Sequence, residues 1–333
     1  MSKERLSFVT GANDKYFFMC SILLQSLEKY FPEISCFVMD FGLTDSQTKF
    51  FETKKQLLKV PPHLKKTDHF FKLKSSVGSF LKDQSIGIPI WVDSDIIAVA
   101  PESNQLFEIA DRLSCQREQI AIGVNFGVRS KITNIREHLE DGPTPKLRAT
   151  VANSPEILES PYLNSGLVFF SDFKVFEDWE NTASLLEGDW LWEQNALNLI
   201  CYRNRSRVLT LDSRVWNVHC ELLKKITIDD NRVYCDGQKS IFAHATTPTP
   251  DTGDVDYVRM TISKNGYACN TYLRLFTNSF LRMAQDKHLS DFLSANFVLL
   301  KDLNVLFKQG TRRNESCPCG SGKAFKHCHG THL

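Results

Sequence analysis

The sequence predicts an α/β fold in which a mixed, mainly parallel sheet is flanked by helices. Three segments, at residues 6–14, 35–43 and 88–100, have the largely continuous apolar character of strands that are buried on both faces. Residues 15–30 and 44–58 follow the first two with helical periodicity, so strand and helix alternate. With 333 residues, 42% of them hydrophobic, and 24 Phe, the chain can bury the core that such a sheet needs.

Composition argues against several classes of protein. The formal net charge of +1 gives no general signal for nucleic-acid binding. No apolar run approaches the roughly 20 residues of a transmembrane helix, and the start, Met-Ser-Lys-Glu-Arg, leads into a strand-like segment instead of the apolar core of a signal peptide. Most of the ten Cys are scattered without a spacing rule, which is typical of reduced thiols. We therefore expect a cytoplasmic protein without a transmembrane segment.

The first strand ends in a turn that suits a ligand. Gly11 and Ala12 are small enough for a bound molecule to approach the backbone. Asn13 and Asp14 offer acceptors for a base or a ribose at the carboxyl edge of the sheet. The same Asn-Asp pair is also an ordinary cap for the helix that follows, so the turn by itself leaves both interpretations open.

Residues 88–100 carry the most informative feature, because Asp93 and Asp95 interrupt an otherwise apolar run. Charges inside a buried strand need a partner. Side chains two residues apart on an extended segment point the same way, so both carboxylates can face one divalent cation with a bound diphosphate. The alternative is a solvated Asp-Ser-Asp turn at the end of the strand, since these residues are common in turns.

Polar side chains also mark the later elements. The basic helical segment 65–81 holds Lys72 and Lys74, either of which could reach a diphosphate, although lysines on a helix more often face solvent. The pattern then reads, in order, as helix 104–113, strand 120–125, irregular segment 129–161, strand 162–171, helix 190–198 and strand 240–245. The last three elements carry, in turn, a step of small residues at Asn164, Ser165 and Gly166, the pair Glu193 and Gln194, and His244. The irregular segment is typical of a lid, an acceptor-binding element or disorder.

The order of these motifs resembles nucleotide-sugar glycosyltransferases of the GT-A fold, most closely the retaining galactosyltransferase and glycogenin type. The resemblance covers roughly residues 6–250 and rests on short motifs that are specific in combination. It implies a Rossmann-like sheet and a hexosyltransferase-like enzyme. Such an enzyme transfers a sugar from a nucleotide-diphosphate donor, with a UDP-sugar favoured, to an acceptor that can be a glycan, a lipid or a protein.

The resemblance also implies roles for individual residues. The matching metal ligands are Asp93, Asp95 and His244, which would hold Mn²⁺ or Mg²⁺. The matching donor-binding positions are Thr10, Ala12, Asn13, Asp14, Lys72, Asp93, Ser94, Asn164, Ser165 and Gly166. Glu193 and Gln194 match the family's catalytic Asp-Gln pair beside the reacting sugar. The chain departs from the family at Glu193, where Asp is usual, and after His244, where Ala-Thr-Thr-Pro replaces Gly and Lys-Pro-Trp.

The predicted chemistry also follows from the residue types. Negative charge builds on the leaving diphosphate as a nucleotide-sugar bond breaks, so a cation held there stabilises the transition state more than the ground state. Mixed carboxylate and imidazole ligation suits Mn²⁺ better than Mg²⁺. A carboxylate at Glu193 could stabilise an oxocarbenium-like centre or orient sugar hydroxyls. Its alternative is an exposed place in the first turn of a helix.

The sequence of the C-terminal tail predicts a separate zinc-binding module at residues 312–333. Its four ligands are Cys317, Cys319, Cys328 and His329, with thiolate and imidazole groups at a spacing that suits structural Zn²⁺. A segment this short has no hydrophobic core, so metal coordination must supply its folding energy. The stretch resembles the SEC-C motif, which also ends the bacterial preprotein-translocating ATPase. That implies a bacterial protein whose tail docks to another protein or to the ribosome.

We therefore predict a glycosyltransferase domain over residues 1–309, ending in a helical extension at 287–308, followed by the zinc module. A second class is a catalytically inactive scaffold that acts as an adaptor through its tail. The joint presence of both aspartates and His244 argues against it, because a decayed site has no reason to keep all three. A nucleotidyltransferase would usually show a Gly-rich basic loop near its start, which residues 10–14 do not form.

Overall fold

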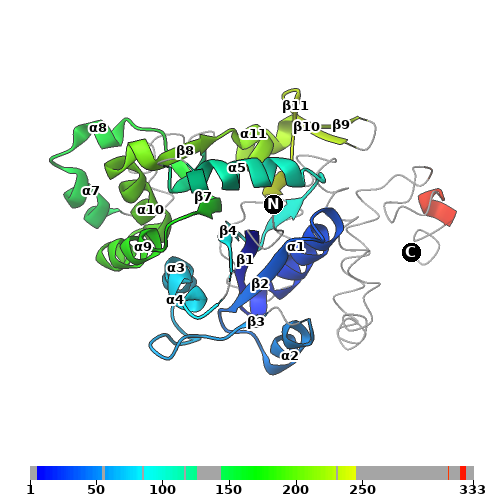
Figure 1. Ribbon diagram of the computed structural model, residues 1–333, viewed down its shortest axis with the longest axis horizontal. Helices are drawn as coiled ribbons and strands as arrows, with labels where there is room; N and C mark the ends of the chain where they lie inside the picture. The colour runs from blue at the N-terminus through cyan, green and yellow to red at the C-terminus, as the bar shows by residue number, and fades with distance from the viewer. Residues whose placement is uncertain are drawn as a thin grey trace.

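A seven-stranded sheet organises the chain (Figure 1). The computed structural model describes residues 6–54, 57–84, 86–115, 118–125, 144–229, 232–244, 314 and 323–327. The strand order is β3-β2-β1-β4-β7-β6-β8. Their bounds are β1 Leu6–Ala12, β2 Ser35–Asp40, β3 Leu57–Leu58, β4 Ile88–Val92, β6 Ile120–Val124, β7 Leu163–Phe170 and β8 Val208–Leu211. β7 runs antiparallel to β4 and β6, and the other pairs are parallel, so the predicted mixed, mainly parallel sheet is confirmed.

Helices cover both faces of this sheet (Figure 1). One core contains residues of α1 (Phe17–Tyr30), α2 (Asp45–Thr53), α5 (Ser103–Cys115) and α11 (Ser213–Trp216). The other contains residues of α3 (Phe70–Ser75), α4 (Val77–Leu81), α7 (Pro145–Val151), α9 (Phe173–Leu186) and α10 (Trp192–Arg203). In β4, Ile90 and Val92 point into the first core and Trp91 into the second. Because both faces are buried, the strands read as continuous apolar runs.

The apolar segment 88–100 is not one strand, contrary to the sequence prediction. β4 ends at Val92, and a turn follows in which the backbone N–H of Ile96 donates to the carbonyl of Asp93 over 3.0 Å. β5 (Ile96–Ala98) then leaves the main sheet and pairs antiparallel with β12 (Phe242–His244). Asp-Ser-Asp is therefore a turn, as the alternative interpretation expected, and the turn joins strands of two different sheets. The turn is not solvated as that alternative supposed, because Ser94 and Asp95 are buried.

Several element boundaries differ from the prediction. The helix expected over 44–58 ends at Thr53, and Leu57–Leu58 pairs with β2 as an edge strand. The helix expected over 65–81 begins at Phe70 and is divided between α3 and α4. The irregular segment contains α7 and α8 (Pro155–Leu158) in its described part. A small antiparallel sheet was not predicted, and consists of β9 (Ile226–Asp229), β10 (Arg232–Cys235) and β11 (Gln238–Lys239).

The predicted helical extension at 287–308 lies outside the described residues, as do the four predicted zinc ligands. A single 3₁₀ turn, Phe325–His327, is described within the tail. None of the helices in the described ranges is both long and apolar enough to cross a membrane.

Candidate active site

A cavity of about 200 Å³ lies beside the ends of β1 and β4 and the start of α10. The predicted site residues that line it are Ala12, Asn13, Asp93, Ser94, Asp95, Asn164, Ser165, Glu193, Gln194 and His244. Side chains that line it without having been assigned to the site include Tyr16, Phe70, Phe71, Lys74 and Asn125. Residues from eight separate segments of the sequence therefore meet around one cavity.

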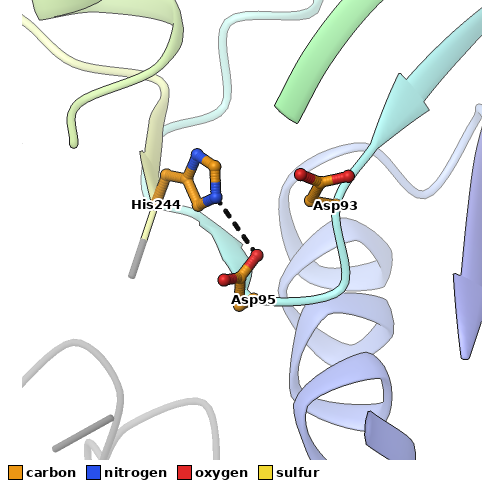
Figure 2. A group of neighbouring side chains, drawn as sticks. All are labelled: Asp93, Asp95 and His244. Atoms are coloured by element: carbon orange, nitrogen blue, oxygen red, sulfur yellow. Dashed lines mark ion pairs between the residues drawn. The ribbon is translucent and has the colours of Figure 1, made fainter. Parts of the chain in front are cut away.

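Asp93, Asp95 and His244 form a group of neighbouring polar side chains that line this cavity (Figure 2). Their ligand atoms all lie within 4.8 Å of one another. His244 reaches Asp95 because β12 pairs with β5 and places His244 opposite Ile96. Its Nε2 lies 3.2 Å from Oδ1 of Asp95. Two carboxylates and one imidazole, without a thiolate, are a donor set that fits Mn²⁺ or another divalent ion of similar preference.

Asp93 also makes side-chain and backbone contacts with neighbouring residues of the protein. Its Oδ1 accepts a hydrogen bond from Nε1 of Trp91 at 2.7 Å and lies 2.8 Å from Nζ of Lys74. Its backbone N–H donates to the carbonyl of Gly166 in β7 at 2.7 Å. These contacts hold the carboxylate at the end of β4 whether or not an ion is bound.

The lysine of the site is Lys74, not Lys72, which the family resemblance had matched. Lys74 is only 6% exposed, and its Nζ lies 3.0 Å from both Oε1 of Glu193 and Oγ of Ser165. Burial lowers the pKa of the Lys74 ammonium, but Asp93 and Glu193 outweigh that effect, so its pKa is raised. The side chain of Lys72 is 40% exposed and pairs with Asp68 instead. Lys74 is thus a charged bridge between the Asp-Ser-Asp turn and α10.

Glu193 and Gln194 enter the cavity from the first turn of α10. Glu193 is 2% exposed, so the alternative of a solvent-facing residue is wrong. The hydroxyl of Ser165 donates to Oε1 of Glu193 at 3.0 Å, and its backbone N–H donates to Oε1 of Gln194 at 3.0 Å. Burial raises the pKa of the Glu193 carboxyl more than Lys74 lowers it. The helix is preceded by Leu191 at the N-cap position, which has the left-handed φ of 50° that is uncommon for a bulky residue.

Four predicted donor-binding residues are not among those that line the cavity, namely Thr10, Asp14, Lys72 and Gly166. Thr10 is fully buried in β1, and Asp14 is exposed in the turn that precedes α1. Gly166 lies directly behind the cavity wall. A Cβ atom added to it would lie 2.4 Å from Cε1 and 2.8 Å from Nδ1 of His244. The small residue is therefore needed so that the His244 ring can pack over β7.

The Gly166→Ala variant tests this packing. The added methyl group must displace the His244 ring, so we expect the variant to fold but to bind Mn²⁺ more weakly, by about tenfold or more. Titration calorimetry with Mn²⁺ measures the effect. Gly237→Ala is the matched control, because nothing lies within 4 Å of its added Cβ, although its positive φ brings a backbone cost of its own. Unchanged Mn²⁺ affinity in Gly166→Ala would show that the His244 ring is free to move aside.

The sequence reasoning did not assign Asn217 to the site, although it contacts both His244 and Asn164. A single Asn after a short helix has no distinguishing spacing, so no local signal could have identified it. Nor were the aromatic residues Tyr16 and Phe70 assigned, whose ring centroids lie 6.4 Å apart at the cavity wall. Aromatic residues near the start of a helix normally pack in the core, so the sequence pattern did not indicate that these two line the cavity.

Comparison with known proteins identifies the tail. Residues 313–331 match the model of the SEC-C motif. Among curated proteins, protein translocase subunit SecA of Anaplasma marginale is 81% identical over 21 residues, which are 6% of this chain and 2% of that protein. SecA of Bordetella pertussis is 74% identical over 27 residues, or 8% of this chain and 3% of that protein. The similarity to these curated relatives is therefore confined to a very small part of their length and to 21 and 27 residues of the two alignments.

The search of solved structures returned glycosyltransferases. The bifunctional glycosyltransferase WbbM matches 75% of this chain and 47% of its own at 11% identity and a TM-score of 0.48. Mouse xyloside xylosyltransferase 1 matches 74% of this chain and 98% of its own at 12% identity and a TM-score of 0.47. The galactosyltransferase LgtC matches 77% of this chain and 95% of its own at 12% identity and a TM-score of 0.43. The chain thus resembles GT-A glycosyltransferases distantly and ends in a SEC-C motif.

Proposed function

We propose that the chain is a metal-dependent glycosyltransferase that transfers a sugar from a nucleotide-diphosphate donor to an acceptor. The observation that carries this proposal is the convergence of Asp93, Asp95 and His244 beside a cavity that also holds a buried Lys74–Glu193 ion pair. A gain in stability does not explain why buried charges are present, since burying them costs desolvation energy and apolar residues of similar volume are often as stable. Ionisable groups gathered in one cavity with shifted pKa values are typical of a catalytic site.

In this proposal Asp93, Asp95 and His244 hold Mn²⁺, or Mg²⁺ in its place. When bound, the ion stabilises the charge that develops on the leaving diphosphate. Lys74 keeps Asp93 and Glu193 oriented, because it bridges their carboxylates at 2.8 and 3.0 Å. Glu193 is buried and has no direct access to bulk water. In such a site a carboxylate can stabilise positive charge on a sugar carbon.

The remaining roles are those that the family resemblance implies for residues that line the cavity. Ala12 and Asn13 are proposed to hold the nucleoside, and a UDP-sugar is the favoured donor. Asn164 and Ser165 are proposed to lie under the sugar, with Gln194 beside it. The acceptor, whether glycan, lipid or protein, is left open. We further propose that Cys317, Cys319, Cys328 and His329 bind structural Zn²⁺ and that this tail docks a cytoplasmic bacterial enzyme to a protein or ribosomal partner.

A thermal-shift experiment with UDP tests the donor site. UDP and Mn²⁺ together should raise the melting temperature, because a ligand at a hundred times its Kd stabilises the native state by about 2.7 kcal/mol. UDP alone, in excess chelator, should have little effect relative to chelator without UDP. Equal stabilisation by UDP in chelator would remove the metal bridge from the proposal. Mn²⁺-dependent UDP binding without hydrolysis or transfer of any UDP-sugar would favour the adaptor alternative.

A further inference from the structure

A chain of buried amide and imidazole groups lies behind His244, on the side away from Asp95. It consists of Asn125, Asn164, Asn217 and His219, all of them less than 9% exposed. We propose that Asn217 is the positioning residue that orients the His244 ring and keeps its Nε2 atom available to the divalent ion. This inference rests on the proposed function and adds to it a residue that does not itself touch the donor or the ion.

The direction of each hydrogen bond follows from one backbone group. The N–H of Gly166 can only donate, and it lies 2.9 Å from Oδ1 of Asn164, so that side-chain atom is an acceptor. Asn217 approaches the same oxygen at 2.9 Å, so it must present its amide nitrogen there. The Asn217 oxygen is then left to face His244, whose Nδ1 lies 2.9 Å away. The oxygen and nitrogen of an Asn amide are normally assigned and not observed. Here the backbone N–H of Gly166, which can only donate, determines the orientation of the Asn164 and Asn217 amides.

The tautomer of His244 follows from this order. An amide oxygen accepts and cannot donate, so Nδ1 of His244 carries the hydrogen. In the neutral ring Nε2 then has its lone pair free, and this is the atom that lies 3.2 Å from Oδ1 of Asp95. A lone pair that faces a carboxylate oxygen is stabilised when a cation lies between them. Metal-binding histidines generally donate their other N–H to such an oriented acceptor.

The backbone holds Asn217 in register with His244. The backbone N–H of His244 donates to the carbonyl of Val218 at 2.8 Å, and Val218 donates to Phe242 at 3.1 Å. The ring of His219 contacts the carbonyl of Asn217 and Oδ1 of Asn125, each at 2.6 Å. Asn217 is therefore held by its own backbone, by β12 and by the amide of Asn164. A residue fixed from three sides can impose an orientation on its neighbour.

The test measures Mn²⁺ binding directly, by the loss of the free-ion EPR signal, on the full-length protein with its tail loaded with zinc. We expect the Asn217→Ala variant to bind Mn²⁺ about 10- to 100-fold more weakly than the wild type. The matched control is Asn195→Ala. Asn195 is equally buried, and its amide contacts Tyr162 and the carbonyl of Trp190 instead of His244. It should keep wild-type Mn²⁺ affinity, even if its melting temperature falls.

A double-mutant cycle separates positioning from a general structural role. If Asn217 acts through the imidazole, Asn217→Ala should cause no further loss of Mn²⁺ affinity in a His244→Ala background. Losses that add would overturn the inference. Wild-type protein that fails to bind Mn²⁺ would instead contradict the proposed function, so the two failures are distinguishable.

An NMR measurement on the wild type keeps the inference testable if Asn217→Ala does not fold. Selective ¹⁵N labelling of histidine, with Mg²⁺ as a diamagnetic ion, reports which ring nitrogen of His244 carries hydrogen. We expect a protonated Nδ1 and an ion-bound Nε2, with the His244→Ala spectrum supplying the assignment. A hydrogen on Nε2 in the Mg²⁺-loaded protein would overturn the proposal.

Discussion

Replacing Lys74 by Met is expected to abolish sugar transfer and to destabilise the fold by about 3–5 kcal/mol, the usual cost of removing one partner from a buried ion pair. The ammonium group lies between Asp93 and Glu193, and its loss leaves the buried Glu193 carboxylate, and Asp93 with it, without their counter-ion. Met has a side chain of similar length, so the effect isolates the charge. Denaturant unfolding measures the stability, and donor turnover measures the activity.

Lys72→Met is the matched control, because it lies two residues away on the same helix. Its ion pair with Asp68 is exposed to solvent, and such pairs contribute about 0–1 kcal/mol. We expect near wild-type stability and turnover for this variant. If Lys72→Met abolished activity while Lys74→Met did not, the lysine first matched through the family resemblance would be the functional one, and the bridge inferred from the structure would be wrong.

Replacing Asp95 by Asn is expected to lower Mn²⁺-dependent turnover by at least about a hundredfold, since each factor of ten in rate corresponds to about 1.4 kcal/mol and a metal ion supplies several. The change keeps the shape of the side chain but removes the charge that faces His244 at 3.2 Å. Brief EDTA treatment of the wild type should remove activity, and Mn²⁺ should restore it. The zinc content of Asp95→Asn should equal that of the wild type.

Cys317→Ser is the reciprocal variant. It removes a proposed thiolate ligand, so it should lower the zinc content while leaving Mn²⁺-dependent turnover largely intact. Together the two variants separate an open oxygen and imidazole site from a closed thiolate site. Full Mn²⁺-dependent activity in Asp95→Asn would mean that the Asp-Ser-Asp turn is only a turn, and the proposed catalytic centre would have to be abandoned.

Much of the architecture was predictable because it depends on local pattern. Strands buried on both faces must be apolar at successive positions, so β1, β2, β4 and β7 were recognisable as strands. Their boundaries were less predictable. The run 88–100 is apolar except at Asp93, Ser94 and Asp95. Nothing in that pattern distinguishes one long strand from two strands, joined by a turn, that belong to different sheets.

The sequence by itself determined the alternation of the main strands and helices, the aspartate pair and the Cys and His spacing of the tail, because periodicity and covalent spacing are local properties. Only the tertiary structure decided which polar groups meet. Lys72 and Lys74 are separated by about 200° around a helix, so packing against the sheet alone selects the one that enters the cavity. His244 reaches Asp95 because β12 pairs with β5, and Asn217 reaches His244 because Val218 bonds to β12. These contacts depend on strand pairing between distant segments, which no local pattern specifies.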